Sequence, residues 1–467
     1  MQIKFLGAAR EVTGSKHLII TDDGKKILLD CGMFQGKGME TDAMNRDLGF
    51  EPEEIHHIIL SHAHIDHTGL IPYMYKRGFR GSVICTSATR DLCSIMLPDS
   101  GFIQELDTKW FNKKRVRQGL PIVSPIYNVE DAEKSLELFI SVAYNRRFYI
   151  NDRINVKFTN SGHMLGSAVV NLEIIEDGIK KKIAYTGDIG RSRNSLLIPP
   201  SPFPQCDFLI AESTYGNKLH EPQKEVEERL LGIVKKTCVD NRGKLIIPSF
   251  SVGRTQELVF LLNNLYNEGK LPKIEVFVDS PLSVNATDVF RLHIDGMNDS
   301  VKSVLKYDDD PFGFSSLHYI KDIEESKALN SYYKPCIIIS SSGMAEAGRI
   351  KHHIANNISN PANTILIIGY CSPTSLGARI QVPRLKEISI FGEMHPVRAT
   401  IERIEAFSGH GDYGEMIDFL NCQDHEEVKK TFLVHGEYEA QQFYREQLEI
   451  EGFRNIEIPA RGDMFEM

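Results

Sequence analysis

Hydrophobic and polar residues alternate in short runs through the first part of the chain, and this pattern predicts β-strands. The runs are bounded by glycine and aspartate, which are common turn residues. Strands are expected at residues 3–7, 17–20, 25–30, 56–61, 82–86, 154–160, 168–175 and 181–188. The stretches 88–96 and 130–139 have an apolar spacing that is typical of helices. The N-terminal part is therefore predicted to be rich in strands, with helices between some of them.

From about Asp207 the pattern changes to strand-like segments that alternate with helix-like segments. Strands are expected at residues 208–214, 244–250, 274–280, 335–341 and 363–370. Such alternation predicts βαβ units, and therefore a largely parallel sheet covered by helices. The pattern changes again after about Phe391. With 467 residues the chain is too long for one ordinary hydrophobic core, so at least two domains are expected.

The composition argues against several classes of protein. Hydrophobic residues make up 42% of the chain and charged residues 25%, as is typical of soluble globular proteins. No apolar run reaches the ~18 residues that a transmembrane helix needs, and MQIKFLGAAR lacks the apolar region of a secretory signal. The eight cysteines are scattered without a CxxC pair. This favours reduced thiols in a cytoplasmic protein over a disulfide framework or a zinc knuckle.

The formal net charge of −9 weighs against a polyanionic partner, because nucleic-acid-binding proteins usually carry a basic patch. A bound pair of metal ions would add positive charge that the sequence charge does not count. The charge alone therefore does not decide whether the chain acts on nucleic acid.

Three histidines and an aspartate follow an apolar run in HIILSHAHIDHTGLIP, residues 57–72. The run predicts a buried strand, so His62, His64, Asp66 and His67 are expected at its C-terminal end, the last two beginning a helix. Four ligand-type side chains on one turn can hold metal, and imidazole with carboxylate suits zinc. A polar helix cap with surface histidines is the alternative, but it does not require the H-x-H-x-D-H spacing.

Other apolar runs end in a residue of metal-ligand type in the same way. These residues are Asp30, His163, Asp188 and His435. Taken singly, each aspartate could cap a turn and His163 could be a hydrogen-bonded core histidine. Their recurrence at strand ends, together with the histidine cluster, favours a metal site over unrelated turns.

The segments LLDCG, SHAHIDH, SGHMLGS and YTGDIG resemble, in order and placement, motifs one to four of the metallo-β-lactamase superfamily. The resemblance implies an αββα sandwich that binds two zinc ions. One ion would be held by His62, His64 and His163. The other would be held by Asp66, His67 and a further histidine. Asp188 would bridge the two ions, and Asp30 would orient a ligand through a hydrogen bond.

The rest of the chain resembles the β-CASP group, whose members cleave nucleic acids. AESTYG places Glu212 as motif A, AFSGHGDY places His410 as motif B, and FLVHGE places His435 as motif C. The resemblance covers essentially the full chain. It implies a metallo-β-lactamase domain of residues 1–206 and 391–467, with a Rossmann-like β-CASP α/β domain of residues 207–390 inserted. The active site is expected in the cleft between these domains, which would part to admit a strand.

A histidine as motif C is a feature of the RNA-processing branch, whereas the DNA-repair branch typically has an aliphatic residue there. His435, which would complete the second zinc site, and the early segment GAAREVTGS therefore resemble the RNA branch. The chain resembles the endonuclease subunit of the cleavage and polyadenylation machinery and its stand-alone prokaryotic relatives. The implied partner is single-stranded RNA, and family analogy also allows a homodimer.

For this branch the resemblance implies hydrolysis of RNA by a hydroxide that two zinc ions activate, with endonuclease action favoured over 5′-exonuclease action. Asp66 would bind metal and orient the nucleophile. His410, paired with Glu212, would protonate the leaving 3′-oxygen. The products would carry 5′-phosphate and 3′-hydroxyl ends. Without the resemblance, Glu212 could cap a helix and His410 could be a surface histidine.

Two strand-to-helix turns in the alternating part are candidate phosphate sites, because free N–H groups at a helix start favour anions. The first turn contains Arg254, and the second contains Ser341, Gly343 and Arg349. Ser408, beside motif B, is a further candidate. Ordinary βα turns use the same residue types. The loop GYCSPTSLGARI departs from the Gly-Thr-x-Gly-Arg-type segment of relatives, which leaves the RNA path and preference open.

Three other functions remain open from the sequence. A thioesterase or lactonase of the same fold would not need the alternating insert, and His435 argues against a DNA nuclease. An inactive scaffold that binds RNA or a partner would typically have lost several metal ligands, and none is lost here. Metal content and side-by-side hydrolysis of RNA, DNA and a thioester would discriminate between these functions.

Overall fold

The computed structural model describes residues 1–36, 40–220, 226–369, 371–372, 374–404 and 408–467. These residues form two compact units, the first of Met1–Leu219 and His410–Met467 and the second of His220–Gly409. Within the described ranges, no helix has the length and apolar character needed to span a membrane. All eight cysteines are free thiols.

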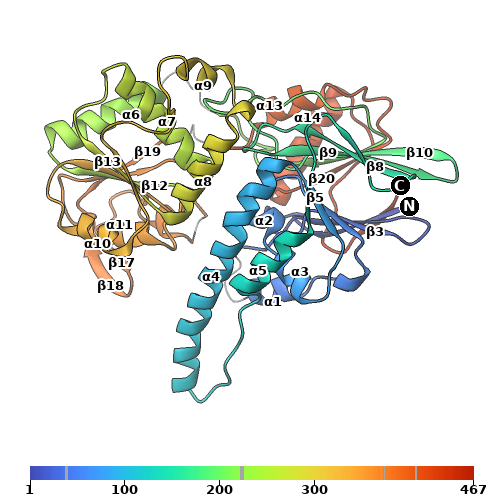
Figure 1. Cartoon of the computed structure of the whole chain (residues 1–467), viewed down its shortest axis with the longest axis horizontal. Helices are drawn as coiled ribbons and strands as arrows, with labels where there is room; N and C mark the ends of the chain where they lie inside the picture. Colours follow the sequence, from blue (N-terminus) through green and yellow to red (C-terminus); the bar gives the residue numbers. More distant parts are fainter. Residues whose placement is uncertain (37–39, 221–225, 370, 373, 405–407) are drawn as a thin grey trace. The chain divides into compact units, whose positions relative to one another are not determined.

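Two seven-stranded mixed sheets form a sandwich in the first unit (Figure 1). The first sheet, in the order β22-β1-β2-β3-β4-β5-β6, consists of Gln2–Gly7 (β1), Lys16–Ile20 (β2), Lys26–Leu29 (β3), His57–Ile59 (β4), Ser82–Cys85 (β5), Phe139–Ser141 (β6) and Met464–Glu466 (β22). The second, in the order β21-β20-β11-β10-β9-β8-β7, consists of Arg147–Tyr149 (β7), Ile154–Asn160 (β8), Ala168–Glu176 (β9), Ile179–Tyr185 (β10), Phe208–Glu212 (β11), Lys430–Val434 (β20) and Ile456–Glu457 (β21). Alternate side chains of both sheets, including Phe5, Ile27, Phe158 and Ile210, form one buried core between them.

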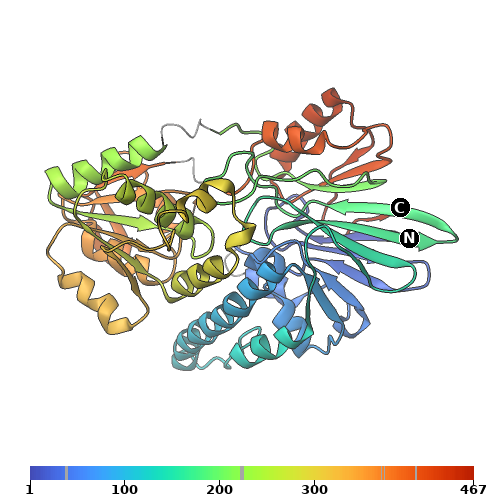
Figure 2. The same ribbon diagram turned by 45° about the horizontal axis from the view of Figure 1, so that its top comes forward.

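Helices cover the outer faces of this sandwich (Figure 2). On the side of the first sheet lie Glu40–Arg46 (α1), Ile65–Thr68 (α2), Ile71–Lys76 (α3), Ser87–Arg117 (α4) and Val129–Ser135 (α5). Tyr413–Leu420 (α13) and Tyr438–Glu451 (α14) cover the second sheet, and Met416 and Tyr444 pack there against Leu209 and Leu433. This four-layer αββα arrangement is the one implied by the sequence.

The second unit contains a six-stranded parallel sheet in the order β14-β13-β15-β12-β16-β19. Its strands are Lys244–Pro248 (β12), Glu275–Asp279 (β13), Leu317–Ile320 (β14), Cys336–Ser340 (β15), Thr364–Ile367 (β16) and Thr400–Arg403 (β19). Its α-helices are Val226–Val234 (α6), Arg254–Asn267 (α7), Pro281–Leu292 (α8), Asp299–Val304 (α9), Ile323–Ser331 (α10), Arg349–Asn357 (α11) and Leu376–Arg379 (α12). Glu387–Ile390 (β17) and Glu393–Pro396 (β18) form a separate hairpin. The predicted parallel sheet is confirmed, because central strands such as β15 are buried along their whole length.

The boundaries between the units differ from those expected. The segment 207–219 belongs to the first unit, since β11 pairs with β10 and β20 of the sandwich. The segment 391–409 belongs to the second unit, where β19 pairs with β16. The inserted unit therefore runs from 220 to 409 rather than from 207 to 390. A buried strand has the same apolar pattern in the sandwich as in the parallel sheet. The sequence therefore did not reveal which of the two units each boundary strand would join.

Candidate metal centre

The sequence-predicted ligands lie at the ends of neighbouring strands of the first unit. Asp30 directly follows β3, the cluster from His62 to His67 follows β4, Asp188 follows β10, and His435 directly follows β20. His163 lies in the turn between β8 and β9. Because β3 runs parallel to β4, and β10 and β20 run parallel to β11, the residues after these strands meet at one edge of the sandwich.

Local backbone geometry directs several of these residues into the site. Asp30 and His435 adopt the left-handed region, with φ of 56° and 53°, which costs roughly 1–2 kcal/mol for a residue that is not glycine. Gly32 lies against the turn of the histidine cluster, and a Cβ there would overlap the carbonyl oxygen of Asp66. The glycine of LLDCG is therefore needed for this close approach.

Three histidines form the first ligand group. Nδ1 of His64 lies 3.1 Å from Nε2 of His62 and 3.2 Å from Nε2 of His163. Oδ2 of Asp188 completes the group, at 3.4 Å from Nε2 of His62 and 3.5 Å from Nε2 of His163. Three ring nitrogens and one carboxylate oxygen thus face a common point.

The second ligand group is made by Asp66, His67 and His435. The two Nε2 atoms of its histidines are 3.1 Å apart. Oδ2 of Asp66 lies 3.4 Å from Nε2 of His435 and 4.0 Å from Nε2 of His67. Oδ1 of Asp188 lies 3.3 Å and 3.6 Å from the same two nitrogens. The Asp188 carboxylate therefore turns one oxygen to each group.

This donor set fits a pair of metal ions. Oδ1 of Asp188 is buried and has no hydrogen-bond partner within the described part of the chain. Ring nitrogens of different histidines face each other at 3.1–3.2 Å, and their lone pairs repel unless a proton or another cation lies between them. Imidazole nitrogen with carboxylate oxygen is the ligand combination that zinc accepts.

The electrostatics of the pocket also favour bound metal ions. Burial lowers the pKa of His62 well below its usual value and the pKa of His64 to about 4, so both rings are neutral. Burial opposes ionisation of Asp188, but the neighbouring histidines, His435 foremost, hold its pKa well below the usual range. Burial also opposes protonation of His67, yet the surrounding carboxylates raise its pKa well above the usual value. The pocket therefore favours bound positive charge.

A buried hydrogen-bond network behind the ligands fixes the orientation of His67. Nδ1 of His67 donates to Oδ2 of Asp30 at 2.7 Å, which leaves Nε2 facing the second group. Ser61 donates to Asp30 through its backbone N–H at 2.7 Å and its hydroxyl at 2.6 Å. The Tyr185 hydroxyl donates to Oδ2 of Asp30 at 2.7 Å. Asp30 thus lies where the sequence placed it, behind the ligands.

Three supporting residues were not predicted from the sequence. They are Ser61, Tyr185 and Thr214. Nδ1 of His435 can donate to the Thr214 hydroxyl at 2.8 Å, while this hydroxyl donates to the His435 carbonyl at 2.9 Å. Their place in the sequence could have pointed to them, since each lies within three residues of a proposed site residue.

The buried Glu212 and the partly exposed His410 form a pair beside the two ligand groups. Nδ1 of His410 lies 3.1 Å from both carboxylate oxygens of Glu212. The backbone N–H groups of Ile189 and Thr214 also donate to Glu212, at 2.5 Å and 3.2 Å. Burial lowers the pKa of His410, but the negative charge of Glu212 outweighs it and raises that pKa to about 9. His410 is therefore protonated at neutral pH, with Nε2 3.9 Å from Oδ2 of Asp188.

The candidate phosphate contacts belong to the second unit, where Arg254, Ser341 and Arg349 are partly exposed. Arg254 pairs with Glu257. Arg349 donates to Asp279 at 2.6 Å and to the Lys321 carbonyl at 2.6 Å, so its guanidinium is held within its own unit. Contacts of these arginines with RNA stay a prediction.

The other candidate contacts are placed as follows. The Ser341 hydroxyl lies 2.9 Å from that of Ser280, and the Gly343 carbonyl faces Sγ of Cys371. Ser408 lies two residues before His410. In the divergent loop GYCSPTSLGARI, Tyr370 and Pro373 fall outside the described residues, as do Ala406 and Phe407 of motif B.

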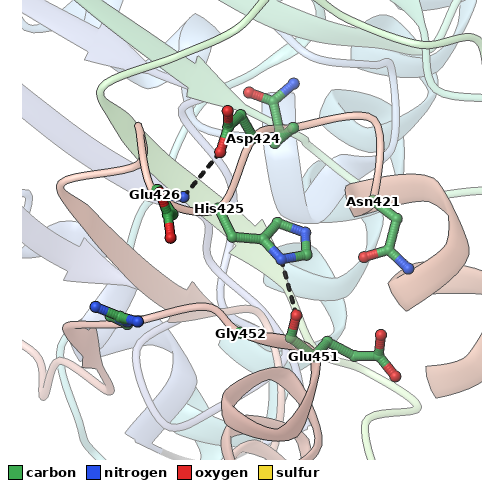
Figure 3. Close-up of a pocket in the computed structure, with 8 residues that line it drawn as sticks. Asn421, Asp424, His425, Glu426, Glu451 and Gly452 are labelled. Carbon is green, nitrogen blue, oxygen red and sulfur yellow. Dashed lines mark hydrogen bonds between the residues drawn. The ribbon is translucent and has the colours of Figure 1, made fainter.

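A polar surface hollow of about 490 Å³ lies apart from these residues, between the end of α13 and the end of α14. Figure 3 shows His425 in this hollow, where Nδ1 donates to the Glu451 carbonyl at 2.8 Å. Asp424 accepts from the backbone N–H of Glu426 at 3.0 Å. The hollow contains none of the predicted site residues, and these contacts are those of a hydrogen-bonded turn.

Three family models match the chain. The Metallo-beta-lactamase superfamily model matches residues 14–91 and the Beta-Casp domain model matches residues 255–380. The model of the Zn-dependent metallo-hydrolase RNA specificity domain matches residues 394–459. The matched ranges include the histidine cluster, much of the parallel sheet, and both His410 and His435.

Curated proteins match over nearly the whole chain. Ribonuclease TTHA0252 of Thermus thermophilus is 34% identical over 440 residues, which cover 94% of each protein. This chain belongs to the β-CASP family of metallo-β-lactamase ribonucleases. The RNase J-like protein of Methanocaldococcus jannaschii is 33% identical, over 93% of this chain and 92% of that protein. Cleavage and polyadenylation specificity factor 73 of Drosophila melanogaster is 31% identical, over 94% of this chain and 60% of that protein.

Membership of the β-CASP family confirms the resemblance drawn from the sequence motifs. It also agrees with the geometry, since the family model that names zinc covers the segment of His435, a residue of the His/Asp cluster that could hold a metal ion. The β-CASP chain therefore combines a metal-dependent hydrolase fold with a His/Asp cluster suited to metal.

Proposed function

We propose that this chain is a zinc-dependent ribonuclease that cuts within single-stranded RNA and leaves 5′-phosphate and 3′-hydroxyl ends. The observation that carries the proposal is the Asp188 carboxylate, whose two oxygens face two separate ligand groups. The match to the RNA specificity domain and the names of the relatives support RNA as the substrate. The free thiols support a cytoplasmic location.

The proposed zinc ligands are divided between two sites that share Asp188. The first site comprises His62, His64 and His163. The second comprises Asp66, His67 and His435. Bound zinc would supply Lewis acidity toward the phosphate and lower the pKa of a water molecule to about 7.

The proton transfers are assigned to residues of the chain. Asp66, beside the second site, would orient the attacking water and accept its proton. His410 carries a proton at neutral pH and faces the site through Nε2, so it would protonate the leaving 3′-oxygen. Glu212 would hold the His410 ring and stabilise its charged form. Because water attacks, the ribose 2′-hydroxyl takes no part in the reaction.

The proposal also includes contacts between the substrate and residues outside the metal centre. Turns at helix starts in the second unit offer backbone N–H groups to phosphates. We assign this role to Arg254, Ser341, Gly343, Arg349 and Ser408. Arg254 and Arg349 would have to exchange their present carboxylate partners for phosphate, so their substitution should affect binding less than loss of a free surface cation.

A substrate panel tests this function. The holoenzyme is incubated with single-stranded RNA, DNA of matched sequence and a thioester, and the ends of any RNA product are identified. The proposal predicts cleavage of the RNA with 5′-phosphate ends. Hydrolysis of the thioester alone would assign the chain to a different metallo-hydrolase activity, and 2′,3′-cyclic phosphate ends would overturn the proposed role of water.

A further inference from the structure

Helix α4 extends far beyond the part of it that packs against the sandwich. Its last buried residue is Gly101, and the described side chains from Phe102 to Arg117 are all at least partly exposed. At a rise of 1.5 Å per residue this outer part is roughly 24 Å long. Figure 1 shows it projecting past the sheets of its own unit, with the following segment returning beside it. We call residues 102–125 the α4 finger.

The returning segment is fastened to the helix, so the finger has a defined shape. Asn112 and Val123 exchange two hydrogen bonds, of 2.8 Å and 2.9 Å, between the amide side chain and the backbone. Nε of Arg115 donates to the Pro121 carbonyl at 2.6 Å. These contacts order a surface element that adds almost nothing to the hydrophobic core, which points to a role in binding.

Large apolar side chains are exposed on this finger. Trp110, the only tryptophan of the chain, is 77% exposed, and Phe102 and Phe111 are 53% and 51% exposed. Leu106 and Ile122 are exposed as well. Gathered apolar side chains on a surface mark a binding site more often than single ones do.

The finger is also basic, in contrast to the chain as a whole. Its residues 102–125 carry five basic side chains and two acidic ones, Glu105 and Asp107, whereas the complete chain has a net charge of −9. The basic residues of this segment are Lys109, Lys113, Lys114, Arg115 and Arg117. Arg115 stacks over the Phe111 ring at 5.5 Å, and the other four are exposed. Trp110 shares its helix face with Lys113, Lys114 and Arg117, at spacings of three, four and seven residues.

We propose that the α4 finger is a binding site for single-stranded RNA, separate from the metal centre. Trp110 would stack on a base, and the flanking lysines and arginine would neutralise phosphates. This inference rests on the proposed function, which makes RNA the substrate, and it gives the acidic chain a local attraction for that substrate.

The arrangement of charges favours RNA over other occupants. Two fingers meeting in a homodimer would bring five basic side chains from each finger together, with only Glu105 and Asp107 of each to balance them. A helix that lies on a membrane separates its apolar and basic residues into two faces. Here Lys109 and Lys113 lie between apolar side chains around the same helix, as on surfaces that combine base stacking with phosphate contacts.

The single tryptophan makes the finger directly observable. The fluorescence of Trp110 is titrated with single-stranded oligouridylate in the zinc-loaded His410→Ala variant, which keeps the metal ligands and does not consume the RNA. We expect saturable quenching. The Lys113→Glu/Lys114→Glu double variant should weaken binding at least tenfold and lower the slope of log Kd against log salt by about 1.4. The matched control is Lys180→Glu/Lys182→Glu, an equal charge change at exposed residues of β10, which should leave binding unchanged.

The possible results separate the finger from the catalytic proposal. Absence of quenching, or an equal loss of affinity in the control variant, would overturn the finger site even if RNA is cut. Quenching by anionic vesicles but not by RNA, or a dimer dissociated by the double variant, would also overturn it. Saturable binding at the finger without any RNA cleavage by the wild type would support the finger and remove the proposed function. Where RNA is cut, Trp110→Ala should raise KM several-fold without lowering kcat.

Discussion

The Asp30 carboxylate accepts a hydrogen bond of 2.7 Å from Nδ1 of His67, and this contact sets the direction of the opposite ring nitrogen. In the first ligand group, Nδ1 of His62 is instead approached by the Ser61 hydroxyl, at 3.0 Å. The orienting contact therefore differs between His67, which faces a carboxylate, and His62, which faces a hydroxyl, and the effect of this difference can be measured.

Asp30→Asn should weaken the second metal site selectively. The amide can no longer hold a charge-assisted hydrogen bond from His67, so metal affinity at the group of Asp66, His67 and His435 is expected to fall about 10–100-fold. The group of His62, His64 and His163 should keep its affinity. Zinc titration against a competing chelator would resolve the two sites, with Asp23→Asn on the surface as the control. Equal weakening of both sites would contradict the assigned role of Asp30.

His410→Ala should slow cleavage by about 10²–10⁴-fold without loss of zinc, because His410 is assigned to the leaving group and not to the metal. The decisive substrate carries sulfur in place of the 3′-oxygen at the cut, since a thiolate leaves without a proton. We expect this substrate to be cut at similar rates by the variant and the wild type. An unchanged defect on this substrate would remove His410 from the role of acid.

A single 2′-deoxynucleotide at the cut site should leave cleavage intact. Water is the assigned nucleophile, so the 2′-hydroxyl is not needed to attack phosphorus. Mass spectrometry of a reaction run in ¹⁸O-water should find the label in the 5′-phosphate of the product. Complete loss of cleavage at the deoxy position, or an unlabelled 5′-phosphate from the all-ribose substrate, would contradict this mechanism.

Lys16 gives the fold a specific pH dependence. Its buried ammonium donates to the carbonyls of Gly14 and Gly32 at 3.1 Å and 2.9 Å and lies 4.1 Å from the centre of the Phe34 ring. Burial lowers its pKa from 10.5 to about 8. Between these values the unfolded chain binds more protons than the folded chain, so this residue makes stability rise with pH.

The Lys16→Met variant removes this contribution. The free energy of unfolding of the wild type, relative to the variant, should rise between pH 8 and pH 10.5 by up to about 3 kcal/mol. Denaturant unfolding of both proteins across this range measures the difference. A flat difference would mean that Lys16 titrates in the folded protein as it does in solvent.

The candidate metal ligands could be proposed from the sequence because most are donor side chains at or near the end of an apolar run. His163 and Asp188 illustrate this, since both follow strands whose pattern is unambiguous. The supporting hydroxyl of Tyr185 could not be predicted, because its partner Asp30 is distant in the chain and meets it only across the two sheets.

Other features escaped prediction for different physical reasons. The helix expected at 88–96 extends to Arg117, and its outer part from Phe102 has no buried side chain that would mark a core-facing stripe. Arg349 has the sequence context of a phosphate contact, yet Asp279, far away in sequence, holds its guanidinium.

The central claim is that the described His/Asp cluster binds two zinc ions and cuts RNA. The most direct test compares the wild type with the Asp66→Ala/His67→Ala double variant on 5′-labelled single-stranded RNA and matched DNA, with zinc measured on both proteins. The account predicts about two zinc ions per wild-type chain, fewer in the variant, and RNA cleavage by the wild type alone. Two zinc ions in the wild type without cleavage of RNA would contradict the ribonuclease assignment while leaving the metal site in place.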